Sequence, residues 1–161
     1  MNAMADKYSA QEVGSIFLYI HEAHPGERYP HLSSMEQKFA HAQDMRDVLG
    51  AARPLLLDSL DGACHLAYGG MPNMTWVFNR AGVPLYKADW TDAESVQNAL
   101  AYLLDVAARR KAGENLTPFR VERLDYRNRD REAFFKVLER AGPKAVREFE
   151  EAFGADWAAK R

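Results

Sequence analysis

One stretch, residues 17–25 with the sequence FLYIHEAHP, constrains the fold of this chain more than any other. Its apolar first half predicts a short strand over residues 16–20, buried on both faces of a largely parallel sheet. Two histidines, a glutamate and a proline follow at once. Open α/β sheets place their chemistry at the carboxyl ends of such strands. We therefore expect Glu22 and His24 to lie at a functional site.

Hydrophobic periodicity and turn signals predict the other elements. A helix without an N-cap residue covers residues 1–11, and a long loop covers residues 21–37. Ser34 caps a helix that runs to residue 52 and includes Phe39 and Leu49 among its apolar positions. There follow a buried strand over 54–58, a short helix over 63–68, strands over 75–78 and 83–88 joined by a tight turn, and a helix that ends near residue 113.

The last third of the chain differs in character. Residues 114–128 read as irregular, and two amphipathic helices follow, over 130–141 and from Pro143 onward. The second carries an apolar stripe of Val146, Phe149, Phe153 and Trp157, which suits either a packing face over the sheet or a homodimer interface. We place a boundary near residue 113, between an α/β domain (1–113) and a helical C-terminal extension (114–161).

Composition excludes several classes of function. The chain has 161 residues, 47% of them hydrophobic, and a net charge of −2, which favours neither nucleic acid nor an anionic membrane. It shows no apolar run of membrane-spanning length and no signal peptide, so we expect a cytoplasmic protein. Cys64 is the single cysteine, which rules out an intrachain disulfide and a Cys-x-x-Cys redox pair.

The order of elements is that of the thioredoxin fold, in which a cis-proline precedes the hairpin; Met71-Pro72 is the candidate for that bond. Residues 19–24 (YIHEAH) resemble the Tyr-Ile-x-Glu-Ala-His motif of the iodothyronine deiodinases and their bacterial deiodinase-like relatives. Residues 51–58 (AARPLLLD) and the strand that ends in Tyr86-Lys87 are also similar to this family. The resemblance covers residues 1 to about 104 and leaves the C-terminal helices unexplained.

The resemblance implies a thioredoxin-like sheet flanked by helices and incomplete at its N-terminus. The family's first core strand, and the selenocysteine or cysteine loop after it, would be encoded upstream of Met1, behind a codon normally read as stop. That strand is central in the sheet, so both its neighbours would lose a partner. We expect residues 17–20 to pair directly with the third strand instead, or the chain to self-associate or fold poorly.

The implied function is selenol- or thiol-dependent reduction, such as reductive dehalogenation or peroxide reduction of a small molecule. Glu22 and His24 would be catalytic, and Tyr68, Met71 and Pro72 would lie beside the substrate. Cys64 is either a resolving thiol or a small buried residue. A thioredoxin- or glutathione-type reductant would supply electrons, without a metal or other cofactor. The 161 residues lack the nucleophile, so we expect them to be inactive or nearly so.

Other readings of these residues remain open. His21 suits a surface position, and His41 a solvated helix position. A metal set of His21, Glu22, His24 and His31 lacks the helical spacing of known motifs. Met74 stands where the animal enzymes carry arginine, and Ala-Asp-Trp follows Lys87 instead of a glycine-rich run, which argues against thyroid-hormone-like substrates. The alternative function is a non-catalytic binding or scaffold module that holds a partner between residues 21–37 and the C-terminal helices.

Overall fold

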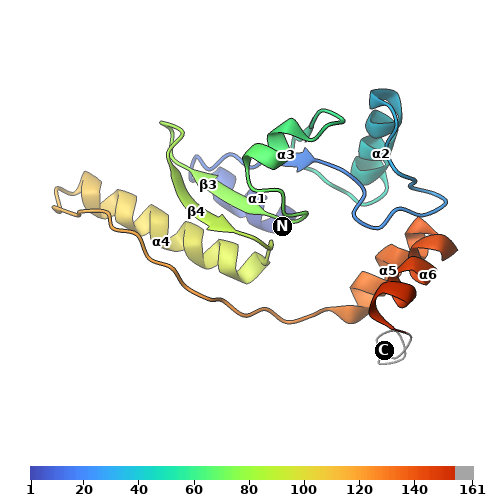
Figure 1. The fold of residues 1–161 in the computed structure, drawn as a ribbon. Helices are drawn as coiled ribbons and strands as arrows, with labels where there is room; N and C mark the ends of the chain where they lie inside the picture. The colour runs from blue at the N-terminus through green and yellow to red at the C-terminus, as the bar shows by residue number, and fades with distance from the viewer. Residues whose placement is uncertain (155–161) are drawn as a thin grey trace.

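The computed structural model describes residues 1–154 as a mixed α/β protein of six helices and two small sheets (Figure 1). Trp157 lies outside the described residues. In chain order the elements are α1 (Asn2–Ser9), β1 (Phe17–Tyr19), α2 (Met35–Asp47), β2 (Leu55–Leu57), α3 (Ala63–Ala67), β3 (Thr75–Phe78), β4 (Pro84–Ala88), α4 (Ala93–Lys111), α5 (Arg131–Ala141) and α6 (Pro143–Phe153). Each predicted element is present. Among the described helices, none combines the length and apolar character that crossing a bilayer requires.

The first sheet pairs β1 with β2 in parallel, with Leu18 opposite Leu56. The crossover between them contains α2, which Ser34 caps by accepting a hydrogen bond from the Gln37 N–H at 3.1 Å. The predicted end of α2 near residue 52 is wrong, because the helix stops at Asp47. Gly50 follows soon after and has φ of +68°, a left-handed conformation through which a helix cannot continue. Pro54 then favours extended backbone at the residue that precedes it.

The buried face of α2 is partly polar. Lys38 is 1% exposed and Ala42 2%, whereas Phe39 is 55% exposed. Phe39 and Leu49, apolar positions of the predicted helix, are therefore exposed, and Leu49 lies beyond the end of α2. Lys38 and His41 point inward because polar groups beneath the helix hydrogen-bond to them.

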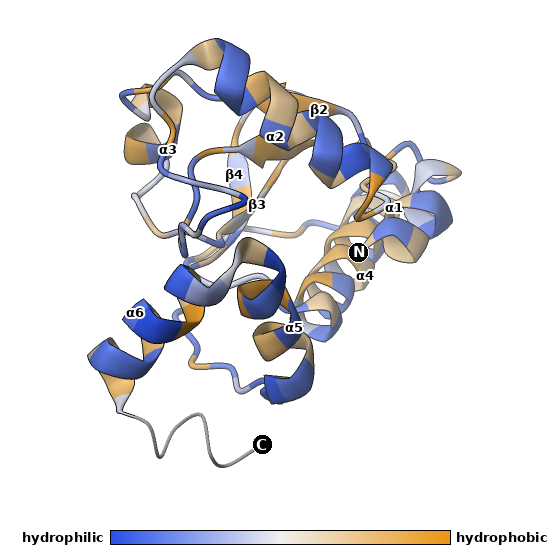
Figure 2. Cartoon of the chain, turned by 90° about the vertical axis from the view of Figure 1, so that its right-hand side faces the viewer, coloured by the Kyte–Doolittle hydropathy of each residue, from blue (hydrophilic) through white to orange (hydrophobic). Residues whose placement is uncertain are grey.

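The second sheet is the antiparallel β3–β4 hairpin, with Trp76 opposite Lys87. Val77 and Tyr86 project from one face and pack against Tyr8 of α1 and Val96 and Leu100 of α4. Figure 2 shows α1 and α4 side by side. The Met71–Pro72 bond is trans, since no cis bond occurs in residues 1–154, so the predicted cis-proline is wrong. Gly69 and Gly70, with φ of +120° and +74°, turn the chain before β3 instead.

The two sheets are not joined to one another. Within residues 1–154, β1 pairs with β2 and β3 with β4, so the expected direct pairing of residues 17–20 with the third strand is wrong. Phe17 and Tyr19 bond to the β2 segment, and Leu18 therefore turns its N–H and C=O toward the open edge of β1. Leu18 of β1 is only partly buried and Leu56 of β2 is 49% exposed, so neither strand is buried on both faces.

The C-terminal helices form a unit with its own core, here called the α5–α6 hairpin. Phe135, Leu138, Ala141, Ala145 and Phe149 are buried together in it. An irregular, exposed segment, residues 112–130, connects the hairpin to α4 and runs extended along one side of the molecule (Figure 1). The hairpin lies against residues 24–29 of the loop between β1 and α2, here called the docking loop.

Candidate functional site

Glu22 lies at the carboxyl end of β1, where the strand delivers it next to α2. Its Oε1 is 3.1 Å from His41 Nδ1, and it also accepts a hydrogen bond from the Tyr19 hydroxyl. The side chains of His41 and Glu22 are only 10% and 21% exposed. Burial is the main cause that raises the pKa of Tyr19 far above its usual range, and the hydrogen bond to Glu22 is the second. Tyr19 therefore stays neutral and donates its hydroxyl proton to Glu22. The expectation that His41 is a solvated helix residue is wrong.

The pair of Glu22 and His41 can act as a proton-transfer unit. A carboxylate only accepts hydrogen bonds, so His41 donates from Nδ1 and Nε2 remains for proton exchange. Tyr29 of the docking loop packs edge-on against His41, with ring centroids 5.2 Å apart. Arg140 of α5 donates to the Tyr29 hydroxyl at 3.3 Å. The α5–α6 hairpin thereby contacts this pair through one intervening tyrosine.

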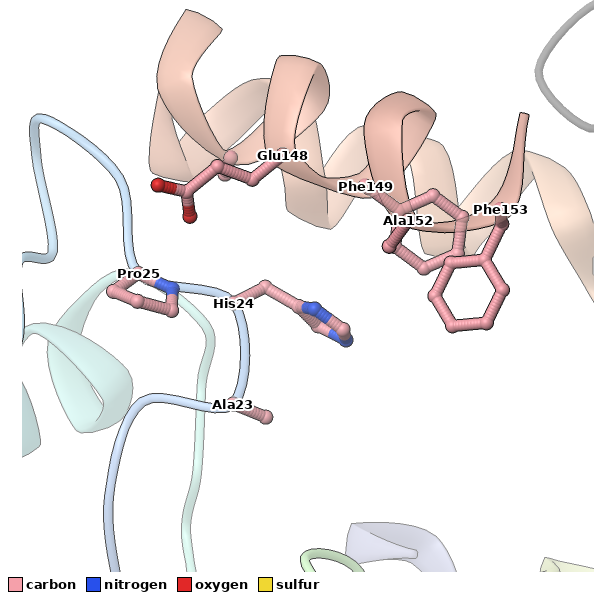
Figure 3. A pocket seen from close by; sticks show the side chains of 8 residues that line it. Ala23, His24, Pro25, Glu148, Phe149, Ala152 and Phe153 are labelled. Atoms are coloured by element: carbon pink, nitrogen blue, oxygen red, sulfur yellow. The ribbon is translucent and has the colours of Figure 1, made fainter. Parts of the chain in front are cut away.

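His24 is only two residues from Glu22, but the structure takes it to a different place. Its ring lies against Phe134 of α5 and Phe149 of α6, with centroids 5.4 and 5.6 Å away. It lines a cavity of about 200 Å³ between the docking loop and α6 (Figure 3). Burial lowers the pKa of His24, which favours the neutral imidazole. Glu22 and His24, predicted as one catalytic set, therefore lie in two neighbouring environments.

A second polar cluster lies at the carboxyl end of β2. Asp58 is 3% exposed and accepts backbone N–H bonds from Ser59, Cys64 and His65 at 2.8, 3.0 and 2.8 Å. Beneath α2, Lys38 donates to the Ser59 carbonyl at 3.1 Å. Burial lowers the pKa of Lys38, and the nearby charge of Asp58 opposes that shift. These hydrogen bonds hold the start of α3 against the end of β2 and against α2.

The other predicted site residues lie around α3. His65 Nε2 donates to the Met71 carbonyl at 2.8 Å, and the exposed His21 ring lies 5.2 Å from the His65 ring. Cys64, on the same helix, is a free, half-buried thiol. The Tyr68 ring packs edge-on against Trp76 and Phe78 at 5.5 and 5.9 Å, on the hairpin face opposite α1 and α4. The structure thus groups His21, Cys64, Tyr68 and Met71 near α3, apart from His24.

The sequence carried a signal for the residues that were missed. Lys38, His41, Ala42 and Met45 stand at positions i, i+3, i+4 and i+7, which share one helix face. A pattern of apolar residues alone does not reveal this face, because Lys38 and His41 are polar. Nothing in the sequence signalled that α5 and α6 would cover His24.

Within residues 1–154, no group of three or more His, Cys, Asp or Glu side chains is arranged to hold a metal ion. The groups that the structure offers for chemistry include the Glu22 and His41 pair, the neutral His24 and the Cys64 thiol. Comparisons of the chain with protein-family models, curated proteins and solved structures found no match.

Proposed function

We propose that these residues are part of a thioredoxin-like oxidoreductase of deiodinase-like type, which reduces a small substrate with a selenol or thiol. The observation that carries this proposal is the split sheet. A parallel pair (β1, β2) and an antiparallel hairpin (β3, β4) each end in an open strand edge. In a thioredoxin-like sheet, one central strand joins two such halves, and the nucleophile follows that strand.

The layers around the strands also support the proposal. Helices α1 and α4 pack together on one face of the hairpin, as the first and third core helices of a thioredoxin-like fold do. Helix α2 crosses between the two parallel strands. Glu22 and His41 lie at the carboxyl end of β1, the edge at which a nucleophile loop on the adjacent strand would open.

In the proposed reaction, the selenolate or thiolate accepts a halogen or oxygen atom from the substrate, which gains two electrons. Dehalogenation leaves a carbanion-like carbon that needs a proton. His41, held through Nδ1 by Glu22, would transfer that proton from Nε2. A second thiol then displaces the halide or hydroxide from the oxidised nucleophile and forms a Se–S or S–S bond with it, and Cys64 is the only cysteine in the sequence for that step. An external thiol reductant breaks this bond and regenerates the nucleophile.

The test is a thiol-dependent reduction assay on protein extended by the segment encoded upstream of Met1. We expect activity with aryl iodides or peroxides, a loss of one to several orders of magnitude in Glu22→Gln and His41→Phe variants, and little change in the exposed-site control His31→Gln. An extended protein without a selenol or thiol nucleophile, or with activity insensitive to both substitutions, would contradict the proposal.

The binding-module alternative is less well supported. It assigns a partner to the loop after β1 and to the C-terminal helices. These surfaces are already engaged with each other through Glu27, Arg28 and Tyr29.

A further inference from the structure

The α5–α6 hairpin is attached to the docking loop by a compact set of polar contacts. The Arg28 N–H donates to the Ala141 carbonyl at 3.0 Å. The Glu27 carboxylate accepts from the Lys144 N–H at 2.9 Å, in the first turn of α6. An acceptor at this position satisfies an N–H group that α6 itself leaves unpaired. The hairpin is thereby oriented on the loop by specific hydrogen bonds.

Two glycines allow this close approach. A Cβ added at Gly26 would collide with the backbone carbonyl of Ala141, and one added at Gly142 would collide with the Glu27 carboxylate. Gly142 also has φ of +124°, which side chains rarely adopt. The interface therefore needs glycine on both sides, which makes it sensitive to a single added methyl group.

The docked hairpin covers His24. In Figure 3 the His24 ring points toward Phe149 and Phe153 across the cavity. Among residues 1–154, Glu148 is the other ionisable residue that lines this cavity, and it pairs with Lys144 at 3.5 Å on α6 itself. His24 is therefore shielded by aromatic rings and not held by a charge.

The connection to α4 leaves the hairpin free to detach. Residues 112–130 are irregular, and Phe119, Leu124 and Tyr126 in this segment are 83%, 78% and 86% exposed. This segment contacts the α/β part near its start, where Arg109 and Arg110 of α4 bond to Glu114 and the Leu116 carbonyl, and again at Arg127, 4.4 Å from the Trp90 ring. Because the hairpin has its own buried core, leaving the docking loop need not unfold it.

We propose that the α5–α6 hairpin is a hinged cover that closes over His24 and opens to admit ligands to it. The assignment of His24 to the reaction pocket rests on the proposed function. The inference that the hairpin covers His24 and opens does not rest on it. Lids of this kind exclude water during a reaction and control access to the site.

The test measures acylation of each histidine by diethyl pyrocarbonate, followed by mass spectrometry, in the full 161-residue protein. We expect Gly26→Ala and Gly142→Ala each to raise the His24 labelling rate severalfold toward that of the exposed His31. The buried His65 should remain slow. Gly14→Ala is the matched control, because a Cβ at Gly14 meets nothing within 4 Å.

A rise confined to His24 supports the cover. An unchanged His24 rate in both variants would overturn it, because His24 would then be equally accessible with the interface disrupted. A rise shared equally by His65 would also overturn it, since the hairpin would then hold the whole fold together. The labelling does not depend on reduction, so an inactive extended protein would leave this inference standing.

Discussion

Replacing Asp58 by alanine is expected to destabilise the folded protein by more than about 3 kcal/mol, because it leaves buried donors without a partner. The N–H groups of Ser59, Cys64 and His65 all bond to this carboxylate. Lys38, 1% exposed, would lose the nearest opposing charge. Urea unfolding, followed by circular dichroism, measures the effect.

The penalty should depend on pH. Burial acts to raise the pKa of Asp58, but the hydrogen bonds from His65, Cys64 and Ser59 outweigh it and the pKa is lowered. A carboxyl group whose pKa is lower in the folded state stabilises the protein fully above its unfolded pKa, about 3.9. That contribution is lost as the pH falls through the folded pKa. The difference between wild type and Asp58→Ala should therefore be largest near neutrality and shrink in acid.

Asp105→Asn is the control for this variant, because the Asp105 side chain on α4 is 61% exposed. It should change stability by less than about 0.5 kcal/mol. If Asp58→Ala and Asp105→Asn had equal effects, the hydrogen bonds of Asp58 to the start of α3 would not stabilise the fold as expected.

Replacing Leu138 by alanine should remove about 2–5 kcal/mol from the stability of the α5–α6 hairpin. Leu138 is fully buried, at 0% exposure, in a core of only a few side chains. A core this small has little capacity to fill the cavity that the substitution leaves. Hydrogen exchange should show lost protection in α5 and α6 and retained protection in α4.

Val137→Ala is the matched control, since Val137 is the preceding residue on α5 and is 56% exposed. It should leave exchange in the hairpin nearly unchanged. Equal loss of protection in α4 after Leu138→Ala would show that the hairpin and the α/β part unfold as one unit.

The sequence was sufficient to locate the elements, because each carries a local signal. Ser34 accepts the capping hydrogen bond expected of it, from the Gln37 N–H. Asp92 caps α4 in the same way, by accepting from the Ser95 N–H. The predicted end of α2 was wrong because a backbone conformation, the positive φ of Gly50, decides where this helix stops. The buried face of α2 does not follow its apolar positions, because tertiary hydrogen bonds to Lys38 and His41 orient the helix and leave Phe39 exposed.

The candidate site could be predicted only in part for a related reason. Strand polarity placed Glu22 at the carboxyl end of β1, as expected. Its partner His41 is 19 positions away, and no local pattern relates the two. The position of His24 depends on the α5–α6 hairpin, which joins the site from more than a hundred residues along the chain.

The proposed function requires that the open edges of β1 and β3 form the place for a strand that carries the nucleophile. Leu18 reports on this edge directly, because its N–H faces away from β2. The measurement is the amide exchange rate of Leu18 in the 161-residue chain and in protein extended by the upstream-encoded segment. We predict fast exchange in the first and strong protection in the second. Equal exchange of Leu18 in the two proteins would contradict the claim.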